Sequence, residues 1–320
     1  MTVVYDTQQE IYEALLANLS SAASMISPSG PKISDGDLLY SGDMNQWRLF
    51  ANSLRLRAAM RLADVDPTLA ASEVASAISA GVFTSSGDNA TLHFVDNGVD
   101  VHPIFGYERN RDDHSISATM VDKLKALNDP RLPIYARANG AGEYVGTLNG
   151  DMSDPPLTEV SRIGTYFSSA ETPAVILSYS EVLFLRAEAA ERGWVAGNAG
   201  QLYADAITAA MAELGVSSTE IQAYLAQPTI QYQSGQAGLE QIWLQKWVSL
   251  FGNGPEAYAE WRRTGVPTLQ PGPDAINDGL IPVRLPYPDR ERSLTREAVE
   301  AAMARQGGAT NNNRVWWDIH

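Results

Sequence analysis

Two glutamates in the middle of the chain have the residue type and spacing of a catalytic acid–base pair. Glu181 and Glu188 lie in an alanine-rich run that ends at Gly193. On a helix, their seven-residue separation puts both carboxyl groups on nearly the same face. Carboxyl groups placed across a sugar drive glycoside hydrolysis. The alternative, which we favour, is structural: both glutamates pair with Arg186, Arg192 or backbone donors inside a pack of helices.

A second segment has the residue types of a sugar-binding surface. Residues 102–114 are irregular and rich in aromatic and planar polar side chains. Rings stack on the apolar face of a sugar, while Asp, Asn and Arg hydrogen-bond its hydroxyl groups. The alternative is a structural loop packed on the core. The candidate ligand-binding residues are His102, Phe105, Tyr107, Arg109, Asp112, Asp113 and His114, with Tyr144 and Tyr166 from the glycine-rich region that follows.

Other chemically capable side chains favour a structural interpretation. Arg55, Arg57 and Arg61 could clamp an anionic ligand, but arginines on an amphipathic helix more often pair with acids and pack their stems. Trp243 and Trp247 could form a sugar platform. Their spacing of four residues beside apolar neighbours predicts a core position instead.

Composition narrows the possible partners and chemistry. The chain has 320 residues, with 23 Lys and Arg against 38 Asp and Glu, so its formal net charge is −15. This charge repels phosphate backbones, and we expect no nucleic-acid partner. The absence of cysteine excludes disulfides, thiolate catalysis and cysteine-based zinc sites. No Walker, G-x-S-x-G or H-E-x-x-H motif occurs, and we predict neither a cofactor nor a metal site.

Helices must position these residues, because strand patterns are scarce. Apolar residues recur at three- and four-residue spacings over residues 6–27 and after Asp43, which is a predicted helix cap. Asp66 is a second predicted cap, since Pro67 follows it at the first helical position. No apolar stretch is long enough to span a bilayer, so we expect the chain to be soluble as given.

Small residues predict how some of these helices pair. The run 173–194 and the helix after it carry alanines at the spacing of a tetratricopeptide-type hairpin. Glycines and prolines over residues 133–172 and 265–292 predict long irregular loops. The expected fold is therefore mostly α, with tetratricopeptide-like helix hairpins and long irregular loop insertions.

Several short segments carry a resemblance to one family. They are Tyr40-Ser41-Gly42-Asp43 with the run from Trp47 to Arg61, the turn Asn128-Asp129-Pro130-Arg131, the run from Leu177 to Trp194, Arg262-Arg263-Thr264-Gly265, Arg284-Leu285-Pro286-Tyr287-Pro288 and Val315-Trp316-Trp317-Asp318. Each is weakly specific, but their order over nearly the whole chain is not expected by chance. Together they resemble the SusD/RagB-like proteins, outer-membrane nutrient-binding lipoproteins of Bacteroidetes.

The resemblance implies a SusD-like fold and a non-catalytic role. Such a protein binds oligosaccharide or polysaccharide at the outer-membrane surface and delivers it to a SusC-like TonB-dependent transporter. In the family it is surface-exposed and lipid-anchored, whereas this sequence carries no signal peptide and no anchor cysteine. Because Tyr5–Tyr12 resembles a segment well inside the family, we expect residues 1–320 to form a single SusD-like domain that lacks the family's N-terminal portion.

Two other functions stay open from the residues alone. A helical-repeat module could bind another protein, the transporter or a sister lipoprotein, without a sugar site of its own. An α-helical glycoside hydrolase could use Glu181 and Glu188 as its acids. The resemblance does not identify the glycan, and another nutrient is compatible with it.

Overall fold

The computed structural model describes residues 4–27, 29–30, 32, 35–111 and 114–320. Over these residues helices dominate, and strands occur as two short antiparallel pairs, which confirms the mostly α prediction. The elements are α1 (Gln8–Met25), α2 (Met44–Arg61), α3 (Pro67–Ala80), η1 (Ser86–Asp88), β1 (Ala90–Leu92), α4 (Pro103–Glu108), α5 (Ala118–Ala126), α6 (Leu132–Tyr135), β2 (Ala136–Arg137), β3 (Arg162–Ile163), β4 (Ala174–Leu177), α7 (Tyr179–Glu191), α8 (Ala199–Glu213), α9 (Ser218–Leu225), α10 (Gln236–Ser249), α11 (Gly254–Thr264), α12 (Asp289–Leu294) and α13 (Arg296–Arg305).

Aspartate caps fix where α2 and α3 begin, as the sequence predicts. The Asp43 carboxylate accepts hydrogen bonds from two first-turn amides of α2, at 2.9 and 3.1 Å. The Asp66 carboxylate accepts one from the Leu69 amide at 3.0 Å, and Pro67 occupies the first position of α3. Each cap satisfies amide groups that have no partner within the helix.

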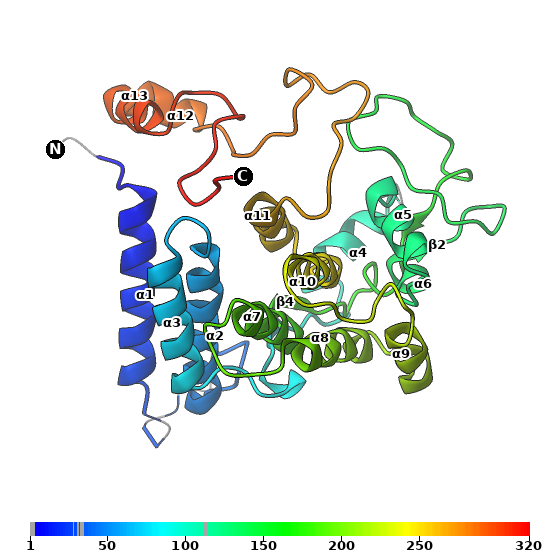
Figure 1. Cartoon of the computed structure of the whole chain (residues 1–320). Helices are drawn as coiled ribbons and strands as arrows, with labels where there is room; N and C mark the ends of the chain where they lie inside the picture. The colour runs from blue at the N-terminus through cyan, green and yellow to red at the C-terminus, as the bar shows by residue number, and fades with distance from the viewer. Residues whose placement is uncertain (1–3, 28, 31, 33–34, 112–113) are drawn as a thin grey trace.

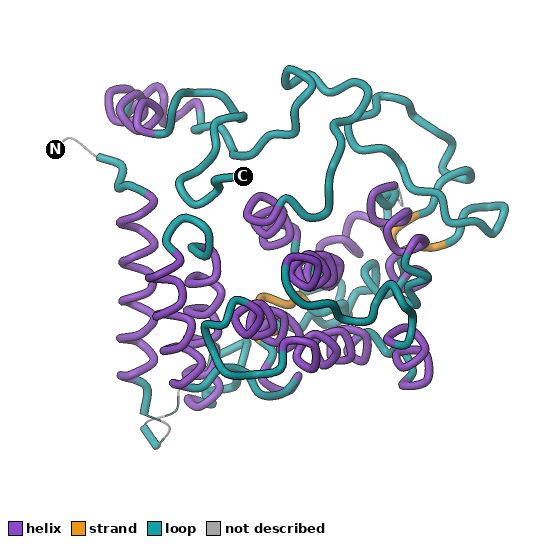
Figure 2. Tube along the Cα trace, in the orientation of Figure 1, coloured by secondary structure: helices purple, strands orange, loops and turns teal. Residues whose placement is uncertain are grey.

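The helices form two neighbouring groups. α1, α2 and α3 lie side by side at one end of the molecule, and α7 packs on α2 while it also contacts α8 and α10 (Figure 1). α7 and α8 form the predicted hairpin, with Ala206, Ile207 and Ala210 buried along α8. The predicted irregular segments are also present: the chain between β2 and β3 and the chain between α11 and α12 run as long loops beyond α10 (Figure 2).

Charged side chains are buried where α7, α10 and α11 meet. Both Glu188 carboxylate oxygens accept hydrogen bonds from the Arg263 guanidinium, at 2.8 and 2.7 Å. Arg263 also pairs with Glu260 at 2.7 Å, and Lys246 reaches Glu260 at 2.9 Å. Desolvation opposes the charge of Arg263, but the two carboxylates outweigh it and raise its pKa well above the usual value. These four residues, which we call the buried charge cluster, carry balanced charges.

The arginines of α2 also have acidic partners, which confirms their predicted structural role. All three side chains lie along the face of α2 that approaches other helices, and each makes a close ion pair. The pairs are Arg55 with Glu73, Arg57 with Glu181, and Arg61 with Glu256.

Asp37 holds the loop before α2 through four hydrogen bonds. Its carboxylate accepts from the amides of Leu39, Tyr40 and Gly42 and from the Trp47 indole, at 2.7–3.1 Å. Partial burial alone would raise the pKa of Asp37, but these bonds outweigh it and lower the pKa to about 2. A lowered folded-state pKa means that the stabilisation is complete above about pH 4, the pKa of the unfolded chain, and is lost as the pH falls towards 2.

We therefore expect Asp37→Asn to lower the melting temperature near neutral pH and to have a shrinking effect as the pH approaches 2. Thermal unfolding followed by circular dichroism at several pH values measures this. Asp35→Asn, at an exposed neighbouring position, is the control and is expected to change little. An Asp37→Asn effect that stays constant with pH would show that the carboxylate charge is not what stabilises the loop.

Candidate functional site

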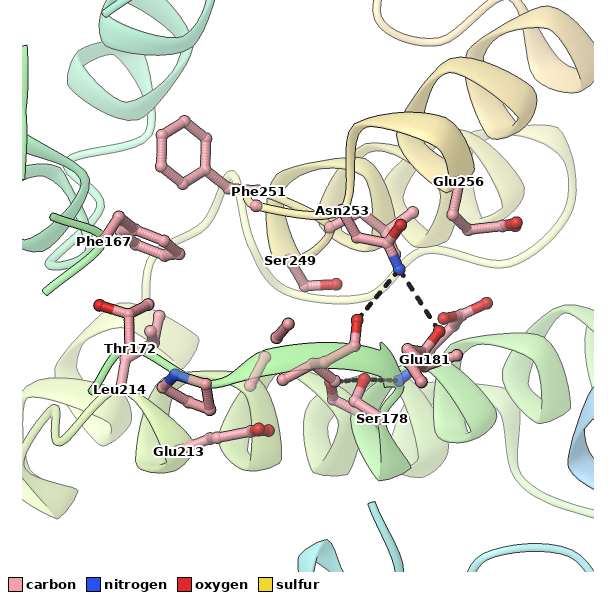
Figure 3. Close-up of a pocket in the computed structure, with 18 of the residues that line it drawn as sticks. Phe167, Thr172, Ser178, Glu181, Glu213, Leu214, Ser249, Phe251, Asn253 and Glu256 are labelled. Atoms are coloured by element: carbon pink, nitrogen blue, oxygen red, sulfur yellow. Dashed lines mark hydrogen bonds between the residues drawn. The ribbon is translucent and has the colours of Figure 1, made fainter. Parts of the chain in front are cut away.

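A cavity of about 470 Å³ lies between β4 and the turn that joins α10 to α11. Its volume is in the range of small-ligand sites. Phe167 and Phe251 lie on one side of it, and Glu181 and Glu256 lie on the other (Figure 3). β4 leads directly into α7, so the strand brings Glu181 to the cavity wall.

The aromatic end of this cavity is rigid because its rings pack on one another. Phe251 stacks on the buried ring of Tyr135, with centroids 4.4 Å apart, and Phe167 meets Phe251 edge-on at 4.7 Å. Tyr166 packs against Phe167 at 4.9 Å. Gly164 allows this turn to approach α6, since a Cβ there would lie 1.8 Å from a backbone oxygen of that helix. The rings are therefore positioned before any ligand arrives.

The polar end offers hydroxyl, amide and carboxylate groups. Arg57 donates to Glu181 at 2.7 and 2.6 Å and lies 3.8 Å from Glu256. Desolvation opposes the charge of Arg57, but these two carboxylates outweigh it and raise its pKa. Ser249, at the end of α10, and Asn253, which donates to the backbone of β4, lie between the two ends.

The charges around the cavity disfavour anionic ligands. Three carboxylates line it, those of Glu181, Glu213 and Glu256, against the one guanidinium of Arg57. His102 is the other titratable nitrogen base at the wall, and partial burial lowers its pKa, so its ring is uncharged near neutral pH. An uncharged ligand fits this balance better than one with carboxylate or sulfate groups.

A family model decides the identity of the fold. The model described as SusD-like, "Starch-binding associating with outer membrane", matches residues 1–288. The chain belongs to the SusD-like family. No curated protein sequence matches it.

Solved structures place the SusD-like fold over the whole chain. A chitin-binding protein is 32% identical, with a TM-score of 0.89 over 100% of this chain and 74% of that one. A chitin-binding SusD homologue from Flavobacterium johnsoniae is 28% identical, with the same TM-score and coverage. A SusD homologue from Bacteroides uniformis ATCC 8492 is 26% identical, with a TM-score of 0.90 over 99% of this chain and 74% of that one.

Two of the predicted ligand-binding residues of this SusD-like chain line the cavity. They are His102 and Tyr166, which come from different segments. The His102 amide donates to the Ala170 oxygen at 2.9 Å, and this bond ties the start of α4 to the turn that carries Tyr166. The His102 ring also accepts from the Ile104 amide, so its Nδ1 is already engaged in capping α4.

The other predicted residues lie away from the cavity wall. Tyr107 is exposed and its ring meets that of His114, with centroids 6.1 Å apart, while Glu108 pairs with His114. Phe105 is half-buried and Arg109 is exposed. Tyr144 packs against the core beside α5. Asp112 and Asp113 lie outside the described residues. Ligand contacts of all these residues stay a prediction.

The two candidate catalytic glutamates do not share a site. Glu181 lines the cavity, whereas Glu188 is fully buried against Arg263 and does not line it. The structural interpretation is confirmed in kind, and the expected Arg192 pairs with Glu188 at 3.0 Å. The partner of Glu181 differs from expectation: it is Arg57 of α2, because that helix packs across the start of α7.

Sequence reasoning missed the residues of the α10–α11 turn. Ser249, Phe251 and Asn253 follow the buried part of α10, where the predicted helix simply ends. A usable signal was present, since a Phe and an Asn between Gly252 and Gly254 place an aromatic and an amide side chain in a short turn.

Two further searches concern metals and membranes. Among residues that the structure describes, no group of three or more His, Asp or Glu side chains could hold a metal ion. No helix within the described ranges is long and apolar enough to cross a bilayer.

Proposed function

We propose that this chain is a non-catalytic glycan-binding protein of the outer-membrane surface and that the cavity of Figure 3 is its sugar site. The observation that carries the proposal is a SusD-like fold whose cavity has packed rings at one end and hydroxyl, amide and carboxylate groups at the other. Rings bind the apolar face of a sugar, and the polar groups hydrogen-bond its hydroxyls. Ligand is bound and released without any bond being broken.

The proposed ligand class is a neutral glycan. Excess carboxylates at the cavity disfavour uronic acids and sulfated sugars. Two similar structures are named as chitin-binding, which supports oligosaccharides of N-acetylhexosamine as the first candidates. The family description, which places these proteins at the outer membrane, supports delivery to a SusC-like TonB-dependent transporter as the following step. The exposed ring pair of Tyr107 and His114 would extend the contact surface.

Tyr166→Ala tests the site directly. Native affinity electrophoresis in gels containing glycol chitin, starch or xyloglucan measures retardation of the folded protein. We expect one neutral polysaccharide to retard the wild-type chain and the substitution to weaken binding about three- to tenfold, the loss of one ring contact.

Tyr107→Ala is the companion variant, because it removes a ring outside the cavity. An effect of Tyr166→Ala alone supports the cavity, and an effect of both adds the exposed pair to the site. Retardation that neither substitution alters would place the sugar elsewhere. No retardation of folded wild type by any glycan would favour the protein-binding module, and release of reducing sugar would overturn the non-catalytic role.

A further inference from the structure

A second cavity, of about 680 Å³, adjoins the first. It lies between the start of α5, the end of α10 and two loops, at residues 149–150 and 269–282. The two cavities share part of their wall, which includes Phe167, Phe251 and Gly252. One extended ligand could therefore occupy both.

The second cavity has no charge on the described part of its wall. Apolar side chains form most of the lining, including Met120, Ile163 and Trp247. Its polar side chains are neutral hydrogen-bonding groups, those of Ser117, Thr119, Asn149 and Gln270. In a chain with 19% charged residues, this lining contrasts with the first cavity, where carboxylates and a guanidinium reach the wall.

The roof of the second cavity is built from two loops that are bonded to each other. The Asp274 amide donates to the Gly150 oxygen at 3.0 Å, and the Asp274 carboxylate accepts from the Met152 amide at 2.8 Å. At Gly272 the backbones touch, since a Cβ there would lie 2.0 Å from the Asn149 oxygen. In Figure 1 these loops meet above α5, at the side of the molecule opposite α1. The roof is thus held in place by specific contacts.

We propose that the second cavity receives the N-acyl group of an amino sugar, so that the protein selects N-acetylated hexosamine oligosaccharides. This inference rests on the proposed glycan-binding function. An acetamido group is uncharged: its methyl would pack on apolar residues such as Trp247, and its N–H and C=O match neutral side chains such as Asn149. A free amine carries charge near neutral pH, and an uncharged wall cannot replace its water. A hydroxyl at the same carbon brings no apolar surface.

Titration calorimetry at mildly acidic pH tests this selectivity with three oligosaccharides of equal length. These are an N-acetylated chito-oligosaccharide, its deacetylated form and a cello-oligosaccharide. We expect the acetylated ligand to bind at least about tenfold more tightly than either of the others. Equal affinity for all three would remove the inference and leave the proposed function in place. Binding of none would remove both.

Ala275→Trp locates the effect, because Ala275 lines the second cavity and the indole would fill it. We expect this variant to lose the preference for the acetylated ligand and to keep the weaker binding common to all three. Ile276→Trp is the matched control, since Ile276 is 98% exposed and the same ring would point to solvent. A preference that survives in Ala275→Trp would place the acyl group elsewhere.

Saturation-transfer NMR of wild type gives a test that needs no variant. The acetamido methyl protons are expected to receive the strongest saturation of the ligand, because they would be the most enclosed. Strongest saturation at ring protons instead would overturn the placement. A wild-type cavity that takes the neutral probe N-phenyl-1-naphthylamine without competition from the acetylated ligand would also overturn it.

Discussion

Glu188→Gln is expected to destabilise the folded chain by about 3–5 kcal/mol. The substitution keeps the shape of the side chain and removes one charge from the buried charge cluster. Arg263, which is 1% exposed, would then share Glu260 with Lys246, and the cluster would carry one uncompensated positive charge away from water. Chemical denaturation followed by tryptophan fluorescence measures the loss in the free energy of unfolding.

Two further variants separate charge imbalance from the loss of a hydrogen bond. Glu300→Gln breaks an exposed pair with Arg296 and is expected to cost no more than about 0.5 kcal/mol. Glu188→Gln combined with Arg263→Met leaves Lys246 and Glu260 as a balanced pair, and we expect it to be more stable than Glu188→Gln alone. A double variant less stable than the single one would show that packing of the Arg263 side chain, and not charge balance, dominates.

Local sequence patterns predict the helices of this chain well. The caps at Asp43 and Asp66 and the alanine-lined hairpin of α7 and α8 are local features, because capping and helix spacing depend on residues a few positions apart. The structural roles of Trp243 and Arg61 follow equally from local spacing, and both are buried.

The partners across the fold could not be predicted in the same way. Arg57 and Glu181 are separated by 124 residues, so no local pattern couples them, and Arg186 was the nearer expectation. The cavity has the same origin: Arg57, Tyr166 and Phe251 come from three distant segments that meet only when α2, α7 and α10 pack together. Of residues 102–114, His102 alone lines the cavity among those described, because α4 carries the residues after it away from the wall.

Ser249→Trp is expected to abolish glycan binding while leaving the fold intact. Ser249 is the last residue of α10 and lines the cavity between its aromatic and polar ends (Figure 3). An indole at this position would fill the space that the sugar needs, and the helix end tolerates the change because the serine hydroxyl bonds only to the Lys246 oxygen, one turn earlier. Ser249→Ala removes the hydroxyl without adding volume and is the matched control.

The decisive measurement is a calorimetric titration of an N-acetylated chito-oligosaccharide into wild type, Ser249→Ala and Ser249→Trp, each with an unchanged melting temperature. If the cavity of Figure 3 is the glycan site, wild type and Ser249→Ala bind with similar Kd and Ser249→Trp gives no measurable heat. Binding by Ser249→Trp as tight as that of wild type would mean that the glycan site lies outside this cavity.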